Sequence, residues 1–317
     1  MVATNHKIYP ILFHNFMRIL VTGGAGFIGK YLVKSLLEEE HHVTIFDNFS
    51  NSTKNSILYL RDLDVKVIEG DITNPQEILN AGKDKDVIIH LAAKISVSES
   101  ILNPTETFRV NVNGTKNILE SCKKNHVKKL IVASSAAVYG EGNHNVKLSE
   151  TARTNPISPY GESKILMEQE IEKFTSEYKM NIIILRFFNI FGTGQTSEYA
   201  GVITKFIEKI KQKKPLEIFG DGMQTRDFVA IEDIINSIHK AITLEKSGIY
   251  NIASGKAITI KELADKIITL SKEKLKIEYL PEKKGDIKYS QADISLAKKE
   301  LKFFPKFTLD KIQELLQ

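Results

Sequence analysis

The first half of the chain alternates short apolar runs with segments whose apolar residues recur at helical spacing. The apolar runs are rich in β-branched residues, as expected for strands that helices cover on both faces. They comprise residues 18–22, 43–47, 65–70, 86–92, 129–134 and 181–187. Helical segments begin near Gly26, Ser52, Pro75 and Pro104. This alternation predicts right-handed βαβ units and therefore an α/β fold with a Rossmann-type, doubly wound parallel sheet.

Beyond about residue 190 the predicted elements become shorter and more mixed. We therefore expect a dinucleotide-binding domain over residues 17–188 and a smaller, mixed α/β substrate-binding lobe over residues 189–317. Part of the later chain, about 228–255, is expected to return to the large sheet. Residues 1–16 form an N-terminal extension without the long apolar stretch and cleavage site of a signal peptide, and we assign it no role.

Composition narrows the functional classes without selecting one. Of the 317 residues, 42% are hydrophobic and 26% are charged, which is typical of a globular protein with a sizeable core. The single cysteine, Cys122, excludes an intrachain disulfide framework and a cysteine-rich metal site, and it fits a reducing cytoplasm. No apolar run approaches the roughly 18 residues that a membrane span needs. The net charge of +5 is interleaved along the chain without a basic stripe, so we expect no nucleic-acid, membrane or metal partner.

A glycine-rich stretch, "TGGAGFIG", lies between the first predicted strand and the first helix. Gly23, Gly26 and Gly29 give the spacing G-x-x-G-x-x-G, a relative of the G-x-G-x-x-G fingerprint of dinucleotide-binding proteins. Small residues are needed where the chain turns sharply and where its backbone meets pyrophosphate, and a helix N-terminus offers free N–H groups to phosphate. The stretch, which also contains Phe27 and Ile28, therefore predicts a phosphate site for a dinucleotide.

Asp47 ends the second predicted strand. Its carboxylate is placed to accept hydrogen bonds from the ribose hydroxyls of an adenosine. A 2′-phosphate in this position would meet like charge, and no arginine follows nearby to neutralise it. Asp47 therefore favours NAD over NADP as the cofactor, with service as a turn residue as the alternative.

Tyr160 and Lys164 lie four residues apart, so they share one face of a predicted helix. A free tyrosine has a pKa of about 10 and is a poor base at neutral pH. A lysine ammonium one turn away, together with the positive nicotinamide ring of a bound cofactor, would favour the phenolate, which is the kind of base that alcohol oxidation needs. The serines of "ASSAAVYG", residues 133–140, leave the fifth strand and can hydrogen-bond a substrate hydroxyl or carbonyl. An exposed amphipathic helix is the alternative for the Tyr–Lys pair alone.

Ten short motifs occur in an order that resembles one known family. They are "TGGAGFIG", "DNFSNS", "GDI", "HLAAKISVSES", "NVNGT", "SSAAVYG", "YGESK", "RFFNIFG", "IFGDGMQTRDFV" and "GDIKYSQAD". The resemblance covers residues 17–317 and points to the extended short-chain dehydrogenase/reductases, in particular their UDP-glucose 4-epimerase-like, nucleotide-sugar epimerase branch.

This resemblance implies roles for residues around the cofactor. Tyr160 matches the catalytic base, Lys164 the residue that tunes it and binds the nicotinamide ribose, and Ser135 the active-site serine, with Ser134 its near neighbour. The adenosine-side positions are Asp47, Asn48, Asp71 and Ile72, and the positions lining the rest of the groove are Leu91, Ala92, Ala93 and Asn111. His90, at a strand end in this stretch, is interpreted as a structural histidine.

The resemblance also implies substrate-binding positions. Besides Ser135 they are Asn189, Val202, Phe219, Arg226, Lys283, Asp286 and Ser290. Arg226 matches an arginine that pairs with a diphosphate, which a guanidinium can bind in a bidentate manner; an ion pair with Asp227 is the alternative. Lys283 stands where family members usually have a second arginine, so the charge is kept without the planar fork. Ser290 matches a gatekeeper position at which a small side chain leaves space for an N-acetyl group.

The expected activity is reversible inversion at C4 of a UDP-hexose through a 4-keto intermediate. UDP-glucose and UDP-galactose are the expected substrates, and the hypothesis includes UDP-N-acetylhexosamines. UDP-glucuronate 4-epimerase stays open as an alternative. Dehydratases of the family usually carry an Asp-Glu pair where this chain has Ser135-Ala136, and decarboxylases commonly carry a glutamate at Ala136. A non-catalytic dinucleotide-binding regulator is the alternative from another class.

Family members pair through the helix near residues 104–124 and the helix that bears the catalytic tyrosine. The resemblance therefore implies a homodimer held by a four-helix bundle. Here the second helix carries Tyr160.

Overall fold

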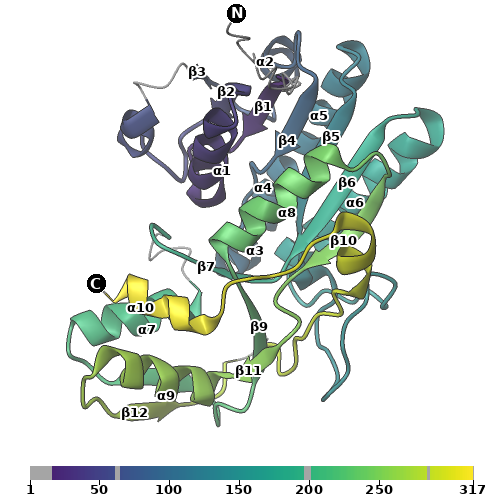
Figure 1. The fold of residues 1–317 in the computed structure, drawn as a ribbon. Helices are drawn as coiled ribbons and strands as arrows, with labels where there is room; N and C mark the ends of the chain where they lie inside the picture. The colour runs from purple at the N-terminus through teal and green to yellow at the C-terminus, as the bar shows by residue number, and fades with distance from the viewer. Residues whose placement is uncertain (1–15, 61–64, 196–200, 284–285, 317) are drawn as a thin grey trace, which may run out of the picture.

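A large parallel sheet forms the centre of the molecule (Figure 1). The computed structural model describes residues 16–60, 65–195, 201–283 and 286–316. In spatial order the seven strands are β10 (Gly248–Ile252), β6 (Asn181–Phe187), β5 (Lys129–Ser135), β4 (Val87–His90), β1 (Arg18–Thr22), β2 (His42–Asp47) and β3 (Lys66–Glu69). All neighbouring strands are parallel. The chain winds outward from β1 in one direction and from β4 in the other, which confirms the predicted doubly wound sheet and places a topological switch point between β1 and β4.

Helices cover both faces of this sheet. α1 (Phe27–Glu38) and α8 (Ile231–Thr243) contact each other over one face. The other face is covered by α2 (Pro75–Ala81), α5 (Gly114–Lys124) and α6 (Pro159–Glu177). Successive strand residues enter opposite cores: Ile19 and Val21 pack with α1 and α8, and Leu20 packs with the helices of the other face. Because both faces are buried, the strands are almost continuously apolar, which explains why the sequence pattern located them.

The helix expected near residues 104–124 is built from three parts. α4 (Pro104–Phe108) begins the helix, a π-helical turn (Arg109–Asn113) follows, and α5 completes it. α3 (Val97–Leu102) comes immediately before, and both α3 and α4 contact α6. Two short 3₁₀ helices, Lys54–Leu60 and Ala136–Val138, lie after β2 and after β5.

The smaller lobe has its own sheets and core. One sheet has the strand order β11 (Ala257–Thr259), β9 (Thr225–Ala230), β7 (Asn189–Phe191), and the other pairs β12 (Ile277–Leu280) with β8 (Leu216–Phe219). The helices of the lobe are α7 (Val202–Lys211), α9 (Ile260–Ser271) and α10 (Ile312–Leu315). Of the segment expected to return to the large sheet, β9 stays in the small lobe, whereas α8 covers the large sheet and β10 pairs with β6.

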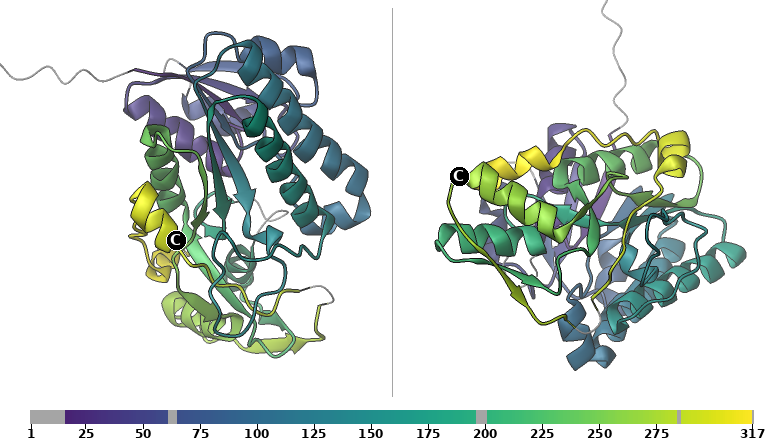
Figure 2. Two further views of the ribbon diagram at one scale, coloured as in Figure 1. Left: turned by 90° about the vertical axis from the view of Figure 1, so that its right-hand side faces the viewer. Right: turned by 90° about the horizontal axis from the view of Figure 1, so that it is seen from below.

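The C-terminal segment connects the two parts of the molecule (Figure 2). It leaves a π-helical turn, Ala297–Leu301, that contacts β10 and α8, passes a 3₁₀ turn, Leu309–Lys311, and ends at α10, which contacts α9. The Asp233 carboxylate of α8 accepts hydrogen bonds from the backbone N–H groups of Lys306 (2.9 Å) and Phe307 (3.1 Å).

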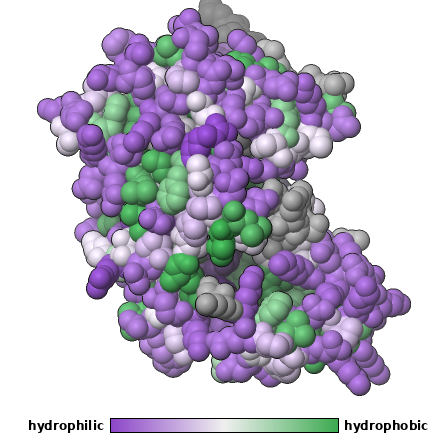
Figure 3. Space-filling view, turned by 180° about the vertical axis from the view of Figure 1, so that it is seen from behind, coloured by the Kyte–Doolittle hydropathy of each residue, from purple (hydrophilic) through white to green (hydrophobic). Residues whose placement is uncertain are grey.

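The surface is mostly hydrophilic, and hydrophobic side chains gather near the middle of the face shown in Figure 3. Large exposed apolar side chains occur on α3, where Ile101 is 62% and Leu102 is 85% exposed, and on α6, where Leu166 is 37% exposed. Within the described residues, no helix combines the length and the apolar character that crossing a bilayer would require. The expected extension, apart from Phe16, lies outside those residues.

Candidate active site

A cavity of about 1140 Å³ lies at the carboxyl ends of the central strands and extends into the small lobe. This is where ligands bind in doubly wound sheets. Nearly all the residues predicted for the site line it: Gly23, Gly26, Phe27, Ile28, Gly29, Asp47, Asn48, Asp71, Ile72, Leu91, Ala92, Ala93, Ser135, Tyr160, Lys164, Asn189, Val202, Phe219, Arg226, Lys283 and Asp286. Asn111 and Ser290 are buried and are absent from the lining.

The glycine-rich loop brings backbone to the cavity where a side chain would not fit. Gly23 has φ +72°, and a Cβ atom there would lie 2.7 Å from the backbone nitrogen of Ala92. A Cβ atom on Gly29 would lie 2.3 Å from the Gly23 carbonyl oxygen. Gly26 is the N-cap of α1 and supplies no side-chain cap, so the first-turn N–H groups remain available to an anion. This loop fits the pyrophosphate of a dinucleotide.

Asp47 is held by the loop that it faces. Its carboxylate accepts hydrogen bonds from the backbone N–H groups of Ala25 (3.0 Å) and Phe49 (2.8 Å), and burial raises its pKa. Both oxygens keep acceptor capacity for a ribose hydroxyl. Among the described residues that line the cavity the sole arginine is Arg226, which belongs to the small lobe. The surroundings of Asp47 therefore fit NAD better than NADP.

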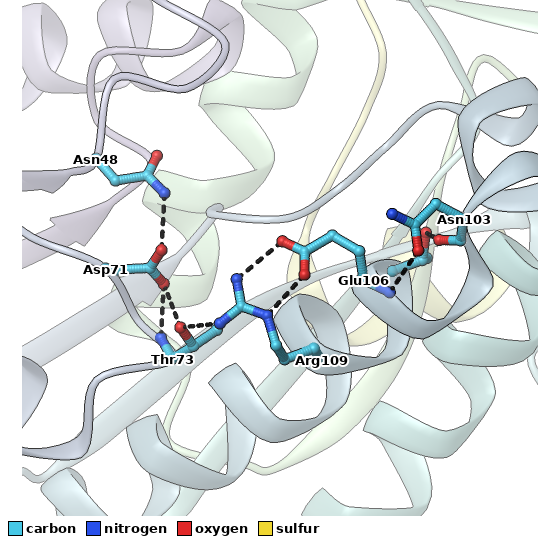
Figure 4. Close-up of polar contacts among 7 residues, drawn as sticks. Asn48, Asp71, Thr73, Asn103, Glu106 and Arg109 are labelled. Carbon is cyan, nitrogen blue, oxygen red and sulfur yellow. Dashed lines mark hydrogen bonds and ion pairs between the residues drawn. The ribbon is translucent and has the colours of Figure 1, made fainter.

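A chain of hydrogen bonds continues from Asp71 towards α4 (Figure 4). Asp71 accepts bonds from Asn48 Nδ2 (3.1 Å) and from the backbone and hydroxyl of Thr73 (both 2.8 Å). Burial acts to raise the pKa of Asp71, but these bonds and the charge of Arg109 outweigh it and lower the pKa. Arg109 donates to Thr73 Oγ1 (2.5 Å) and to both carboxylate oxygens of Glu106. The sequence gives no sign of the Thr73–Arg109 contact, because the two residues are far apart along the chain.

Tyr160 lies in the first turn of α6. Ser158 caps this helix by accepting a hydrogen bond from Gly161 N (3.2 Å), Pro159 begins it, and Ser100 Oγ accepts a bond from Tyr160 N (3.1 Å). Burial raises the pKa of Tyr160, and a hydrogen bond with the Ser135 side chain acts in the opposite direction. Tyr160 and Ser135 are thus adjacent on the cavity wall.

Lys164 is buried one turn further along α6. Its Nζ donates to the Ala133 carbonyl (2.9 Å), burial lowers its pKa to about 8, and the charge of Glu168 opposes that shift. Burial is the largest influence on the pKa of Tyr160 in this structure, and the influence of Lys164 that the four-residue spacing predicts stays a prediction. The positive nicotinamide ring of a bound cofactor would act in the same direction as the Ser135 hydrogen bond and lower the pKa of Tyr160.

The side chain of Asn111 is buried behind the cavity wall. Its side chain accepts a bond from Lys94 N (2.8 Å) and donates to Lys94 O (2.9 Å) and to Ser163 Oγ (2.9 Å). Ser163 Oγ in turn donates to the Tyr160 carbonyl (2.7 Å). Asn111 therefore joins the segment after β4 to the first turn of α6, and it supports Tyr160 without facing the cavity.

A buried ion pair lies behind the predicted catalytic residues, and sequence reasoning missed it. Arg186 of β6 donates to both carboxylate oxygens of Glu168, at 3.0 and 2.6 Å, and the two side chains are 5% and 8% exposed. Ser134 Oγ also donates to Glu168, at 2.5 Å. This bond distinguishes the two serines: Ser134 belongs to the buried network, and Ser135 forms the bond with Tyr160.

His90 is a core histidine with both ring nitrogens in hydrogen bonds. Nδ1 contacts Thr22 Oγ1 (2.8 Å) and Nε2 contacts Thr115 Oγ1 (3.1 Å). Burial, followed by the charge of Lys164, lowers the pKa of His90 to about 3. This environment supports the structural interpretation.

Replacing His90 by glutamine is expected to make the folded state less sensitive to acid. An unfolded histidine has a pKa of about 6.5, so between pH 6.5 and the folded value of about 3 the unfolded chain binds more protons. The contribution of His90 is therefore fully present above pH 6.5 and is lost as the pH falls. Urea unfolding should show the wild type losing about 2 kcal/mol more than the variant between pH 7 and pH 5. The exposed-site control His42→Gln should behave as the wild type, and equal losses in all three proteins would contradict the assignment.

In the small lobe, Arg226 faces the cavity with a carboxylate partner. Its NH2 donates to Asp286 Oδ1 (2.6 Å), and its side chain is 14% exposed. Burial lowers the pKa of Arg226, and the charges of Asp286 and Glu141 oppose that shift. Asp227, the alternative partner, instead accepts bonds from the backbone of Ser254, Gly255 and Ala292, and burial raises its pKa to about 6.

The other predicted substrate residues lie around this arginine. Asn189 Nδ2 donates to the Asp227 carbonyl (3.0 Å), and Val202 begins α7, whose N-cap, Gly201, supplies no side-chain bond. Phe219 ends β8 with its side chain 43% exposed. Lys94, Lys205 and Gln224 also line the cavity and were missed, although Lys94 and Gln224 fall within motifs quoted above. Within the described part of the chain, no group of three or more His, Cys, Asp or Glu side chains could hold a metal ion.

Comparisons with known proteins agree with this geometry. The sequence profile of a family described as NAD dependent epimerase/dehydratase matches residues 19–253. A UDP-glucuronate 4-epimerase of Thermodesulfobacterium geofontis is 34% identical over 300 residues, which are 92% of this chain and 92% of that protein. A UDP-glucose 4-epimerase of Corynebacterium glutamicum is 31% identical over 308 residues, again 92% of each chain. Among solved structures, a UDP-N-acetylglucosamine 4-epimerase from Methanobrevibacter ruminantium, in complex with UDP-N-acetylmuramic acid, matches with a TM-score of 0.89 and 36% identity over 95% of this chain and 96% of that one.

Proposed function

Because the chain belongs to the NAD dependent epimerase/dehydratase family, we propose that it reversibly inverts C4 of the hexose in a UDP-hexose, with UDP-glucose and UDP-galactose as the substrates. The observation that carries this proposal is the arrangement of one cavity. Tyr160 and Ser135 lie together on its wall, the glycine-rich loop lines the cofactor end, and Arg226 lines the small lobe. A sugar linked to a diphosphate fits between these groups.

The role that we propose for each residue of the site follows from its position in the cavity. NAD, when bound at the glycine-rich loop, would supply a hydride acceptor for C4, and the return of the hydride would leave no net redox change. Tyr160 takes the proton of the 4-hydroxyl group and gives it back on the other face of the sugar, while Ser135 hydrogen-bonds the same oxygen. Lys164, buried beside them, would hold the cofactor's ribose. Arg226 and Lys283 hold the diphosphate by charge while the keto sugar turns.

The identity of the sugar has competing candidates. Likeness to the Thermodesulfobacterium geofontis protein favours UDP-glucuronate as the second candidate, and likeness to the Methanobrevibacter ruminantium structure favours UDP-N-acetylhexosamines. Ser290 does not support the hypothesis that N-acetylated sugars are accepted, because it is 7% exposed and is absent from the cavity lining. Ala136 and Ala137 directly follow Ser135 in a 3₁₀ turn, so the extra acid of dehydratases and decarboxylases is missing there.

An assay of C4 inversion with a panel of UDP-, GDP- and dTDP-sugars tests the proposal. We expect product from UDP-glucose or UDP-galactose without stoichiometric release of NADH. NADH formed in proportion to product would indicate a dehydrogenase. NAD binding without turnover of any sugar would indicate the non-catalytic regulator.

We also propose that the protein is a cytoplasmic homodimer. The exposed apolar side chains Ile101 and Leu102 of α3 and Leu166 of α6 support a self-association surface, because α3 and α6 contact each other and large apolar patches mark interaction sites. The single cysteine, Cys122, is buried and fits a reducing compartment. Light scattering tests the dimer, since a mass of 35.8 kDa in solution would identify a monomer.

A further inference from the structure

One segment of the small lobe, residues 286–293, is joined by backbone hydrogen bonds to both sides of the active site. On one side it bonds to β9, and on the other it bonds to the loop 141–148 that follows the catalytic serine. The bonds are Thr225 N to Lys288 O (2.8 Å), Gly142 N to Tyr289 O (3.1 Å), Leu148 N to Gln291 O (2.8 Å) and Asp293 N to Leu148 O (2.8 Å). The segment therefore connects the strand that carries Arg226 with the loop that begins beyond Ser135.

The side chain of Glu141 adds to this connection. Its carboxylate accepts bonds from Lys288 N (3.0 and 2.9 Å) and from Tyr289 N (2.9 Å). The next residue, Gly142, lies so close that a Cβ atom there would be 2.4 Å from the Tyr289 carbonyl oxygen. A charged acceptor on two successive N–H groups fixes the local backbone more firmly than neutral bonds do.

The same segment carries the partner of the proposed diphosphate ligand. Asp286, two residues before Lys288, accepts the hydrogen bond from Arg226 NH2 (2.6 Å). Glu141 acts on Arg226 as well, since its charge favours the guanidinium against the effect of burial on the arginine's pKa. Glu141 thus contacts backbone that lies 147 and 148 positions further along the chain, in the segment that also carries the partner of Arg226.

We propose that Glu141 is a positioning residue that fixes the separation between Arg226 and the Ser135–Tyr160 pair. This inference rests on the proposed function, because that separation is the length over which a nucleotide sugar would stretch. Glu141 is exposed and does not line the cavity, so it acts through the 286–290 backbone and not through contact with the substrate.

Weaker binding of the diphosphate has a specific chemical consequence. In the proposed inversion the sugar would give a proton to Tyr160 and a hydride to the bound cofactor, and it would remain a ketone until both return. If the diphosphate is held loosely, the 4-keto nucleotide can leave first. The sugar then departs oxidised by two electrons, and those electrons stay on the enzyme as reduced nicotinamide. Release of the 4-keto nucleotide therefore reports on how firmly the diphosphate is bound and not on the overall stability of the protein.

The test compares Glu141→Ala with two control variants in the full-length enzyme. Glu141→Gln keeps an oxygen that can accept both N–H groups, and Glu38→Ala removes an exposed carboxylate whose partner is a surface lysine. We expect Glu141→Ala to weaken UDP binding, measured by calorimetry, by about tenfold, as the loss of hydrogen bonds to a charged acceptor implies. It should also accumulate enzyme-bound reduced nicotinamide during turnover, seen by its near-ultraviolet absorbance. Glu141→Gln should stay within about threefold of the wild type, and Glu38→Ala should be unchanged.

Two outcomes overturn the inference. One is a folded Glu141→Ala with wild-type UDP affinity and no reduced nicotinamide. The other is a Glu141→Ala whose sole change is a lower melting temperature, which would show a purely structural role. If no sugar is turned over by the wild type but UDP binding still weakens in Glu141→Ala, the proposed function fails and the positioning role stands.

Discussion

Replacing Tyr160 by phenylalanine is expected to lower kcat by about 10²–10⁴-fold, the usual contribution of a positioned acid–base group. The variant loses one oxygen, which lies beside Ser135 on the cavity wall. Phenylalanine keeps the ring and the packing of the first turn of α6, whose support comes from Ser158 and Ser100 through backbone contacts. The loss should therefore fall on proton transfer.

The measurement separates chemistry from cofactor binding. We expect NAD retained by the purified Tyr160→Phe protein to match the wild type, because the phosphate loop and Asp47 are untouched. Tyr178→Phe, at the other end of the same helix, is the matched control and should keep wild-type turnover. A Tyr160→Phe enzyme with wild-type kcat would remove Tyr160 from the mechanism.

The large sheet was predictable because burial on both faces leaves a local signal. The central residues of strands such as β5 and β6 form continuous apolar runs, and the limits of these strands agree with the predicted runs to within one residue. The small lobe gave no such signal. Its strands β7 and β11 have three residues each, too few for any periodicity to show. Its fold depends on pairings between distant segments, such as β12 with β8.

In the site, too, some features have a local sequence signal and others depend on contacts between distant segments. The residues that must be particular types, such as the glycines of the phosphate loop and the Tyr160–Lys164 pair, are visible as local patterns and line the cavity. Supporting contacts have no local pattern. Arg226 and Asp286 are 60 positions apart, and nothing in the sequence distinguishes Asp286 from Asp227 as the partner. The pKa of Tyr160 was also beyond local reasoning, because burial by the whole fold determines its direction.

Replacing Arg186 by methionine is expected to destabilise the protein by about 3–5 kcal/mol, since it leaves the Glu168 carboxylate buried without its partner. Burial acts to lower the pKa of Arg186, but the hydrogen bonds and charge of Glu168 raise it, which shows how strongly the two charges depend on each other. Arg186 also donates to Tyr139 Oη (2.9 Å) and to the Glu150 carbonyl (3.0 Å), so its removal frees acceptors on two further segments. Urea unfolding of the folded variant gives the loss directly.

The double variant Arg186→Met with Glu168→Gln identifies the cause. If the cost comes from an uncompensated charge, neutralising Glu168 should recover more than half of the lost stability, because the amide oxygen can still accept the Ser134 hydrogen bond. If the cost comes from lost packing around the guanidinium, the double variant should be no more stable than the single one. If stability is recovered, the double variant can also be tested for turnover. The charge of Glu168 favours the ammonium form of Lys164, so its removal should affect the active site. A stable double variant with impaired turnover at high pH would show that the buried pair serves the active site as well as the fold.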